Sequence, residues 1–271
     1  MKTILDQIVI KKAEELVLQK QSTSLKTLEN MLQVSAPTSF SAALSAPGNS
    51  GIIAEFKRSS PSKGTLKDDA NVENITQGYI NSGAVALSVL TNEYFFGAHK
   101  TDFEIARKVN DCPTLRKEFI IDEYQVIESK LMGADVILLI AAVLTPRRTM
   151  ELALIARQAG MEVLLEIHNE EELDHLNEYI NVVGVNNRNL KDFTVSIQRS
   201  MDLYDRLPSN ILKISESGID SPDKLIKLKQ KGFSGFLIGE KFMVTPDPAI
   251  SCLEFINQIQ IKTNTHIVYG F

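Results

Sequence analysis

Short apolar runs alternate with longer amphipathic segments along most of the chain. The runs are rich in β-branched and aliphatic residues, have the length of buried strands, and lie at residues 51–57, 85–90, 114–118, 135–140, 162–167, 182–186, 211–215 and 235–238. Between them lie segments of helical length, such as 146–159 and 221–231, which are each followed by a glycine. Strands that alternate with helices in this way predict a parallel sheet whose faces are covered by helices.

Eight such strand–helix units favour a closed (β/α)8 TIM barrel, an α/β fold, over an open sheet. An extra helix precedes the barrel, because residues 3–20 place apolar side chains at the i, i+3, i+4 spacing. We therefore expect one domain with a helical extension over residues 1–50, a catalytic barrel over 51–260 and a C-terminal tail over 261–271. The Ser- and Ala-rich stretch around 35–50 looks disordered and long enough to carry the extra helix across the barrel rim.

Composition and charge narrow the classes of partner. The formal net charge of -5 and the pI near 5.5 argue against a general nucleic-acid surface, which needs clustered Lys and Arg. The first twenty residues carry charges every few positions, so they predict neither a signal peptide nor a membrane span, and a cytoplasmic location is expected. Cys112 and Cys252 have no metal-binding spacing and predict no disulfide framework.

Polar residues stand at the carboxyl ends of the predicted strands, where barrels of this kind carry their chemistry. They are Glu55 and Lys57 on the first strand, Lys117 on the third, Glu166 on the fifth, Asn186 on the sixth with Arg188 just beyond, and Glu216 on the seventh. Glu55 and Lys57 are two residues apart and share one face of their strand. Buried charges are costly unless they are paired, so this concentration predicts an active site more than a set of separate structural ion pairs.

Glycines follow the last two strands. Ser217 and Gly218 come after the seventh strand, and Gly239 and Glu240 come after the eighth. These loops are the usual phosphate site of the fold, because their backbone amides can approach an anion. We interpret His168 and His175 as members of a solvated acidic face, and we predict no metal site. Because the sequence contains no nucleotide-binding glycine motif, we also predict no organic cofactor.

The order of several longer motifs resembles the indole-3-glycerol-phosphate synthase family of tryptophan biosynthesis. The resemblance extends from the N-terminal helix to about residue 255. It is carried by AEFKRSSPSKG (54–64), LSVLTNEYFFG (87–97), LRKEFIID (115–122), ADVILLIAAVL (134–144), LLEIHNEEEL (164–173), VGVNNRNL (183–190), ISESGI (214–219) and LIGEKFM (237–243).

The resemblance implies a carboxy-lyase that closes the indole ring of 1-(o-carboxyphenylamino)-1-deoxyribulose 5-phosphate with loss of CO2 and water, without metal or cofactor. By resemblance Lys117 is the general acid, and Lys57, Glu166, Glu55 and Asn186 complete the catalytic set. The implied substrate contacts are Ser60, Phe119, Arg188, Glu216 and Ser217, and the implied phosphate contacts are Ser217, Gly218, Gly239 and Glu240. A phosphorylated small molecule is the expected partner, with no nucleic acid or membrane, and with transient contact to other enzymes of the pathway.

Two positions depart from the family pattern, and three alternative functions remain, of which a purely structural or interaction role is disfavoured by the concentration of buried-type charges. Glu118 replaces the usual Asp after Lys117, and Val244 stands where Arg is common; both should affect rate more than reaction type. A phosphoribosylanthranilate-isomerase-type barrel would share the phosphate loops, but it predicts a Cys–Asp pair, which Glu55 and Lys57 contradict. A barrel that binds a phosphorylated metabolite without turnover would be distinguished by binding without product.

Overall fold

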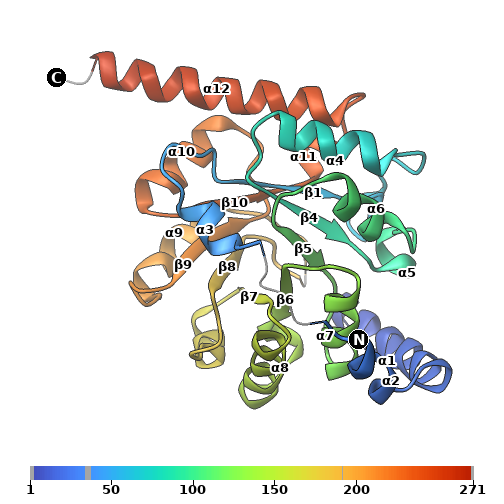
Figure 1. The fold of residues 1–271 in the computed structure, drawn as a ribbon. Coiled ribbons are helices and arrows are strands. Elements are labelled where there is room, and N and C mark those ends of the chain that lie inside the picture. The colour runs from blue at the N-terminus through green and yellow to red at the C-terminus, as the bar shows by residue number, and fades with distance from the viewer. Residues whose placement is uncertain (1–2, 34–37, 191, 270–271) are drawn as a thin grey trace.

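A closed barrel of eight parallel strands forms the centre of the computed structural model, which describes residues 3–33, 38–190 and 192–269 (Figure 1). The strands are hydrogen-bonded in the order β1-β10-β9-β8-β7-β6-β5-β4, and β4 returns to β1. This confirms the predicted fold. The barrel strands are β1 (Ile52–Phe56), β4 (Ala86–Leu90), β5 (Thr114–Lys117), β6 (Val136–Ile140), β7 (Glu162–Ile167), β8 (Val182–Asn186), β9 (Leu212–Glu216) and β10 (Gly235–Ile238).

Helices surround the barrel and connect successive strands. The connection from β7 to β8 holds only a 3-10 helix, so helical cover is thinner there. After β1 the chain adds a small hairpin of β2 (Ser59–Ser60) and β3 (Gly64–Thr65), which periodicity could not predict. The connecting helices are α4 (Val72–Asn81), α5 (Glu93–Phe96), α6 (Asp102–Val109), α7 (Glu123–Leu131), η1 (Ala141–Val143), α8 (Pro146–Gln158), η2 (Glu170–His175), α9 (Gln198–Leu203), η3 (Tyr204–Arg206) and α10 (Pro222–Lys231), and α11 (Glu240–Met243) follows the last strand.

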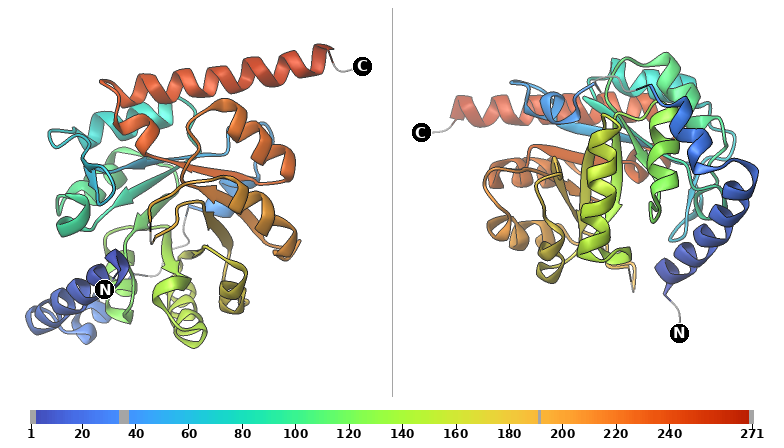
Figure 2. Two further views of the ribbon diagram at one scale, coloured as in Figure 1. Left: turned by 180° about the vertical axis from the view of Figure 1, so that it is seen from behind. Right: turned by 60° about the horizontal axis from the view of Figure 1, so that its bottom comes forward.

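The last helix, α12 (Pro248–Tyr269), runs along the outside of the barrel beside α4 and α10, and its end projects past the barrel (Figures 1 and 2). The expected boundary between barrel and tail at residue 260 therefore falls inside a continuous helix. Within the described part of the chain, none of the helices combines the length and the apolar character that crossing a bilayer requires.

Alternation along the strands decides which side chains enter the barrel. Even-numbered and odd-numbered positions of one strand face opposite sides, so Ile53 packs inside the barrel whereas Ile52 and Ala54 pack against the helices. The same rule places Glu55 on the face of Ile53 and Lys117 on the face of Leu115. The strand-end charges therefore lie above the apolar interior, at the carboxyl rim.

The N-terminal extension contacts both ends of the barrel. The predicted helix is α1 (Ile4–Ser22); it is followed by α2 (Leu25–Met31), and Leu16 and Leu28 pack on Tyr124 and Ile127 of α7. Residues 35–37 of the segment expected to be disordered lie outside the described residues, and the rest of it contains a short helix, α3 (Phe40–Ser45), whose Phe40 is fully buried in the barrel interior. The serines around α3 made this segment look like a disordered loop. They are instead bound to the barrel, because Ser39 and Ser41 both donate to the Glu162 carboxylate at the start of β7.

Candidate active site

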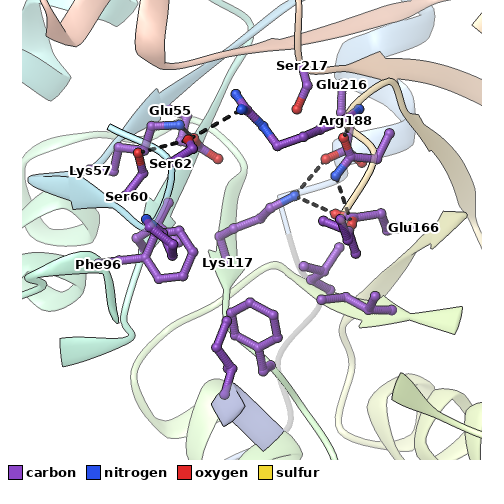
Figure 3. A pocket seen from close by; sticks show the side chains of 18 of the residues that line it. Glu55, Lys57, Ser60, Ser62, Phe96, Lys117, Glu166, Arg188, Glu216 and Ser217 are labelled. Carbon is purple, nitrogen blue, oxygen red and sulfur yellow. Dashed lines mark hydrogen bonds and ion pairs between the residues drawn. The ribbon is translucent and has the colours of Figure 1, made fainter. Parts of the chain in front are cut away.

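The charged side chains predicted at the strand ends converge on one pocket at the carboxyl rim (Figure 3). The structure therefore brings together the residues that the sequence separates by more than a hundred positions. Those lining this pocket are Glu55, Lys57, Ser60, Lys117, Phe119, Glu166, Asn186, Arg188, Glu216, Ser217 and Glu240. A second pocket continues from it and adds Gly218 and Gly239, so each predicted site residue lines one or both.

On β1 the acid and the base are paired. Lys57 Nζ donates to Glu55 Oε1 over 2.7 Å, and Ser88 Oγ on the adjacent strand lies 3.5 Å from Glu55 Oε2. The next residue, Arg58, turns to the other face and forms a buried two-point ion pair with Asp102 of α6. The segment from Glu55 to Arg58 therefore divides into an inward part that lines the pocket and an outward part that pairs with α6.

Lys117 lies between two buried carboxylates across the pocket from Lys57. Its Nζ donates to Glu166 Oε2 over 2.9 Å and to Glu216 Oε2 over 2.6 Å. Asn186 Nδ2 donates to the other oxygen of Glu166 over 3.0 Å. Glu216 Oε1 has no hydrogen-bond partner among the described residues, and a side chain at Gly184 would collide with it. Glycine at 184 therefore makes room for this carboxylate.

Burial and pairing shift the pKa values of these three groups in different directions. Burial alone would lower the pKa of Lys117, but the charges of Glu166 and Glu216 outweigh it and raise that pKa. Burial would likewise raise the pKa of Glu166, yet the Lys117 charge and the hydrogen-bond donors around it hold this pKa well below its usual range. For Glu216 burial dominates, and despite Lys117 its pKa is raised to about 7. The two carboxylates are thus separated in acidity, as acid–base sites require.

The loops after β9 and β10 form the second pocket. Ser217 has a φ of 66° and Gly218 one of 73°, and the left-handed backbone there is unfavourable for serine. Buried Asn187 holds this turn, since its Nδ2 donates to Ser217 O over 3.0 Å and to Ser215 Oγ over 2.9 Å. At the other loop, a side chain on Gly239 would lie 2.6 Å from Glu55 Oε1. Glycine at 239 therefore lets the catalytic strand and this loop approach closely.

The pocket also has an apolar wall, of which the sequence analysis named only Phe119. Ile4, Leu5 and Ile8 of this wall come from α1, so the N-terminal helix lies at the mouth of the pocket. Phe96 faces Phe119 with ring centroids 6.0 Å apart. Arg188 spans the mouth, donating to Ser62 Oγ over 3.3 Å and to Glu240 Oε2 over 3.1 Å. The apolar wall consists of Ile4, Leu5, Ile8, Leu90, Phe96, Phe119, Leu138, Ile140, Leu190, Phe193 and Leu237.

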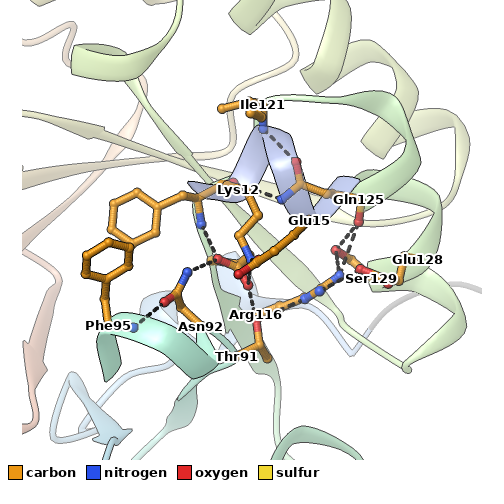
Figure 4. Close-up of polar contacts among 12 residues, drawn as sticks. Lys12, Glu15, Thr91, Asn92, Phe95, Arg116, Ile121, Gln125, Glu128 and Ser129 are labelled. Carbon is orange, nitrogen blue, oxygen red and sulfur yellow. Dashed lines mark hydrogen bonds and ion pairs between the residues drawn. The ribbon is translucent and has the colours of Figure 1, made fainter. Parts of the chain in front are cut away.

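Glu118, the longer acid next to Lys117, joins the barrel to α1. Figure 4 labels its partners Lys12, Thr91 and Asn92. It accepts hydrogen bonds from Lys12 Nζ over 3.2 Å, Thr91 Oγ1 over 3.0 Å and Asn92 Nδ2 over 3.3 Å. Burial would raise its pKa, but the charges of Lys12 and Arg116 hold the pKa below its usual value. The added methylene therefore has a structural use, which is to reach the buried ammonium of α1. Val244, the other departure, ends α11 and is exposed.

The interpretation of the histidines as a solvated face was wrong. His175 is buried and hydrogen-bonded to Thr149 Oγ1, and the His168 side chain is only 10% exposed and lies beside Glu166. A signal for His168 was available, because it follows Glu166 by two residues and alternation predicts a shared face. Among the described residues no group of three or more His, Cys, Asp or Glu side chains is arranged to hold a metal ion.

The fold and the site together define a (β/α)8-barrel enzyme with paired acidic and basic groups beside a second, glycine-lined pocket. Solved structures similar to this chain share the fold: 3-hexulose-6-phosphate synthase from Salmonella typhimurium has a TM-score of 0.61 at 12% identity, covering 78% of this chain and 99% of that one. The tryptophan synthase alpha subunit from Legionella pneumophila has a TM-score of 0.56 at 12% identity, covering 79% and 92%.

Sequence comparison is more specific. A sequence model of the family described as indole-3-glycerol phosphate synthase matches residues 5–255. The chain is 48% identical to the indole-3-glycerol phosphate synthase of Bacteroides thetaiotaomicron over 261 residues, covering 96% of this chain and all of the relative. It is 40% identical to that of Magnetococcus marinus, covering 90% and 94%. The chain belongs to the indole-3-glycerol phosphate synthase family, the carboxy-lyases of tryptophan biosynthesis that its motifs predicted.

Proposed function

We propose that this chain closes the indole ring of 1-(o-carboxyphenylamino)-1-deoxyribulose 5-phosphate, with Lys117 as the general acid. The observation that carries the proposal is the position of the Lys117 ammonium, which faces the pocket and is held by Glu166 and Glu216. An aromatic carbon attacks the substrate ketone, and the ketone oxygen needs a proton as negative charge develops on it. A buried ammonium whose raised pKa keeps it charged supplies that proton and stabilises the charge.

The remaining charged groups fit the later steps. Lys57 faces the same pocket from the end of β1, where a second ammonium stabilises negative charge during loss of CO2 and contributes to proton transfer. Glu166 and Glu55 are then the acceptors for the proton lost on dehydration and the partners of the departing hydroxyl. Asn186 donates to Glu166 and keeps this carboxylate oriented, and it is a further hydrogen-bond donor for the substrate.

Substrate binding is divided between the two pockets. The phosphate fits the second pocket, against Ser217 and the backbone amides of Gly218, Gly239 and Glu240. The aromatic ring fits the apolar wall near Phe96 and Phe119, and its carboxylate lies within reach of Ser60 and Arg188. Binding through the phosphate holds the reacting carbon and ketone close together, which lowers the entropic part of the barrier.

An assay for the indole product tests this proposal. The purified chain, incubated with the carboxyphenylamino-deoxyribulose phosphate and a strong chelator, should produce indole fluorescence and one CO2 per product. Substrate that binds but yields neither product would contradict the proposal and favour a binding barrel. A cytoplasmic location and transient contact with other enzymes of the pathway stay predictions, to be checked by fractionation and crosslinking in cells.

A further inference from the structure

His168 lies between two carboxylates at the end of β7. Its Nε2 is 3.3 Å from Glu166 Oε1, a charged contact whose geometry falls short of a hydrogen bond. On the other side of the ring, Nδ1 is 3.4 Å from Glu172 Oε2. The ring therefore connects a group of the catalytic pocket with an acidic residue of η2.

Glu172 fixes the orientation of this ring. Its Oε2 accepts the backbone N–H of His168 over 2.6 Å, and its Oε1 accepts Asn169 Nδ2 over 3.0 Å. The Glu172 carboxylate is thus held by hydrogen bonds within its own turn, and its Oε2 also contacts the His168 imidazole. A side chain that is 10% exposed and anchored in this way loses little further entropy when it binds Glu166.

On the side of the ring that faces the pocket, different groups contact the two oxygens of the Glu166 carboxylate. Oε2 binds Lys117, whereas Oε1 faces both Asn186 and His168. Two groups on Oε1 fix the plane of the carboxylate, which one bond to Lys117 could not do. His168 also lines a third pocket, whose other charged side chains include Asp6 of α1 and Arg199 of α9. Lys117 lies on the far side of Glu166.

We propose that His168 is a positioning residue: its imidazolium holds the Glu166 carboxylate ionised and oriented toward Lys117 and the substrate. This inference rests on the proposed function for its kinetic consequences only. The contact itself exists whether or not Glu166 acts in ring closure, so it can be tested without turnover.

The direct test is NMR titration of imidazole-labelled protein. Between the Glu166 and Glu172 charges, which overcome the effect of burial, the pKa of His168 is raised to about 9. In Glu166→Gln the midpoint should fall by about one pH unit or more, because the closer charge on Nε2 is lost. His175, whose pKa burial lowers and which contacts Thr149, is the internal control and should not move. A His168 midpoint near 6.5 that Glu166→Gln leaves unchanged would overturn the proposal.

Kinetics give the second test. His168→Leu should lower kcat by about 10-fold or more with little change in KM, since the substrate contacts remain. It should also move the acidic limb of the kcat profile to higher pH, because Glu166 without the imidazolium protonates more easily. His168→Gln, which keeps a neutral donor near Nε2, should recover part of kcat but not the position of the limb. His99→Leu, at an exposed position, is the control.

The outcomes are distinguishable. If the chain forms no indole product at all, the proposed function fails, while the titration still decides the role of His168. If His168→Leu keeps both the wild-type kcat and the wild-type acidic limb, the positioning role is wrong. Should that variant fold poorly, His168→Gln and the titration of the wild-type protein decide the question.

Discussion

Lys12 and Glu118 form a buried ion pair of 3.2 Å between α1 and the end of β5, 106 residues apart in the chain. Lys12 is 8% exposed and Glu118 2%. Removing the ammonium leaves a buried carboxylate with only its neutral donors and Arg116 nearby. Lys12→Met should therefore lower the free energy of unfolding by about 3 kcal/mol, measured by denaturant titration.

Lys11 provides the matched control for this change. It lies on the same helix and pairs with Glu14 over 3.4 Å, but both side chains are largely exposed. Lys11→Met should cost less than about 1 kcal/mol. Equal effects of the two variants would show that the buried pair contributes no more than a surface pair.

Lys117→Met should lower kcat by about 10²–10⁴-fold, because it removes the proposed proton donor while keeping the length of the side chain. Affinity for the product should change much less, since the phosphate loops are untouched. Rapid-quench kinetics and product titration measure the two effects separately. Lys108→Met, on the exposed side of α6, controls for loss of charge. A variant with nearly normal kcat would transfer the donor role to Lys57.

Stability should fall as the pH rises from about 4.5 to 9, because two buried groups have raised pKa values in the folded state. The pKa of Glu216 is about 7 in the folded protein and 4.5 for an unperturbed glutamate. Its contribution to the free energy of unfolding is therefore complete below pH 4.5 and lost as the pH rises through 7. The pKa of His168 is about 9 in the folded protein and 6.5 for an unperturbed histidine, so its contribution to the free energy of unfolding is lost between pH 6.5 and 9. Each loss is on the order of 3 kcal/mol.

Two variants should show which residue causes each part of this fall in stability with pH. Glu216→Gln cannot ionise and should flatten the decline below pH 7, whereas His168→Gln should flatten the decline above it. Urea unfolding at steps of half a pH unit is the measurement. A wild-type stability that rises between pH 5 and 9 would contradict both assignments.

Asn187→Ala should weaken phosphate binding more than it slows chemistry. Without its bond to Ser217 O the left-handed turn loses the contact that holds it, so KM and the dissociation constant for inorganic phosphate should both rise by about 10-fold. Ser200→Ala is the control, because Ser200 binds Asn187 Oδ1 and Ser215 Oγ but not the loop. If Ser200→Ala weakens phosphate binding equally, the effect arises from general disruption of packing around Asn187 and not from loss of its hydrogen bond to Ser217 O.

Deleting residues 1–33 should raise KM while the barrel still folds. The deletion removes Ile4, Leu5 and Ile8 from the pocket wall but keeps Phe40, which fills the barrel interior. Circular dichroism and steady-state kinetics test both parts. A truncated protein with wild-type kinetics would assign α1 to stability alone.

Alternation and strand spacing predicted most of the fold and the charged part of the site. The inward face of β1 follows from the two-residue period, so the sequence alone predicts that Glu55 and Lys57 share one face. The glycines after the last two strands likewise indicated the loops that line the second pocket. Each of these features depends on local order along one strand or one turn.

What could not be predicted depends on contacts between distant segments. The serines that precede and begin α3 bind Glu162, more than 120 residues away, and nothing local distinguishes them from loop residues. The same holds for Lys12, whose partner Glu118 converts an apparently solvated helix position into a buried one. His168 was missed for another reason, because its acidic neighbours suggested exposure, whereas one of them, Glu172, turns back to bind it.

The pairing of Lys57 with Glu55 and of Lys117 with Glu166 and Glu216 also affects how the substrate arrives. An ammonium next to a carboxylate has little field beyond a few ångströms, so these groups attract an anion only after contact. With a net charge of -5 on the whole chain, capture then relies on shape more than on long-range steering. The association rate should accordingly change little with ionic strength, and specificity arises when the anion exchanges partners inside the pocket.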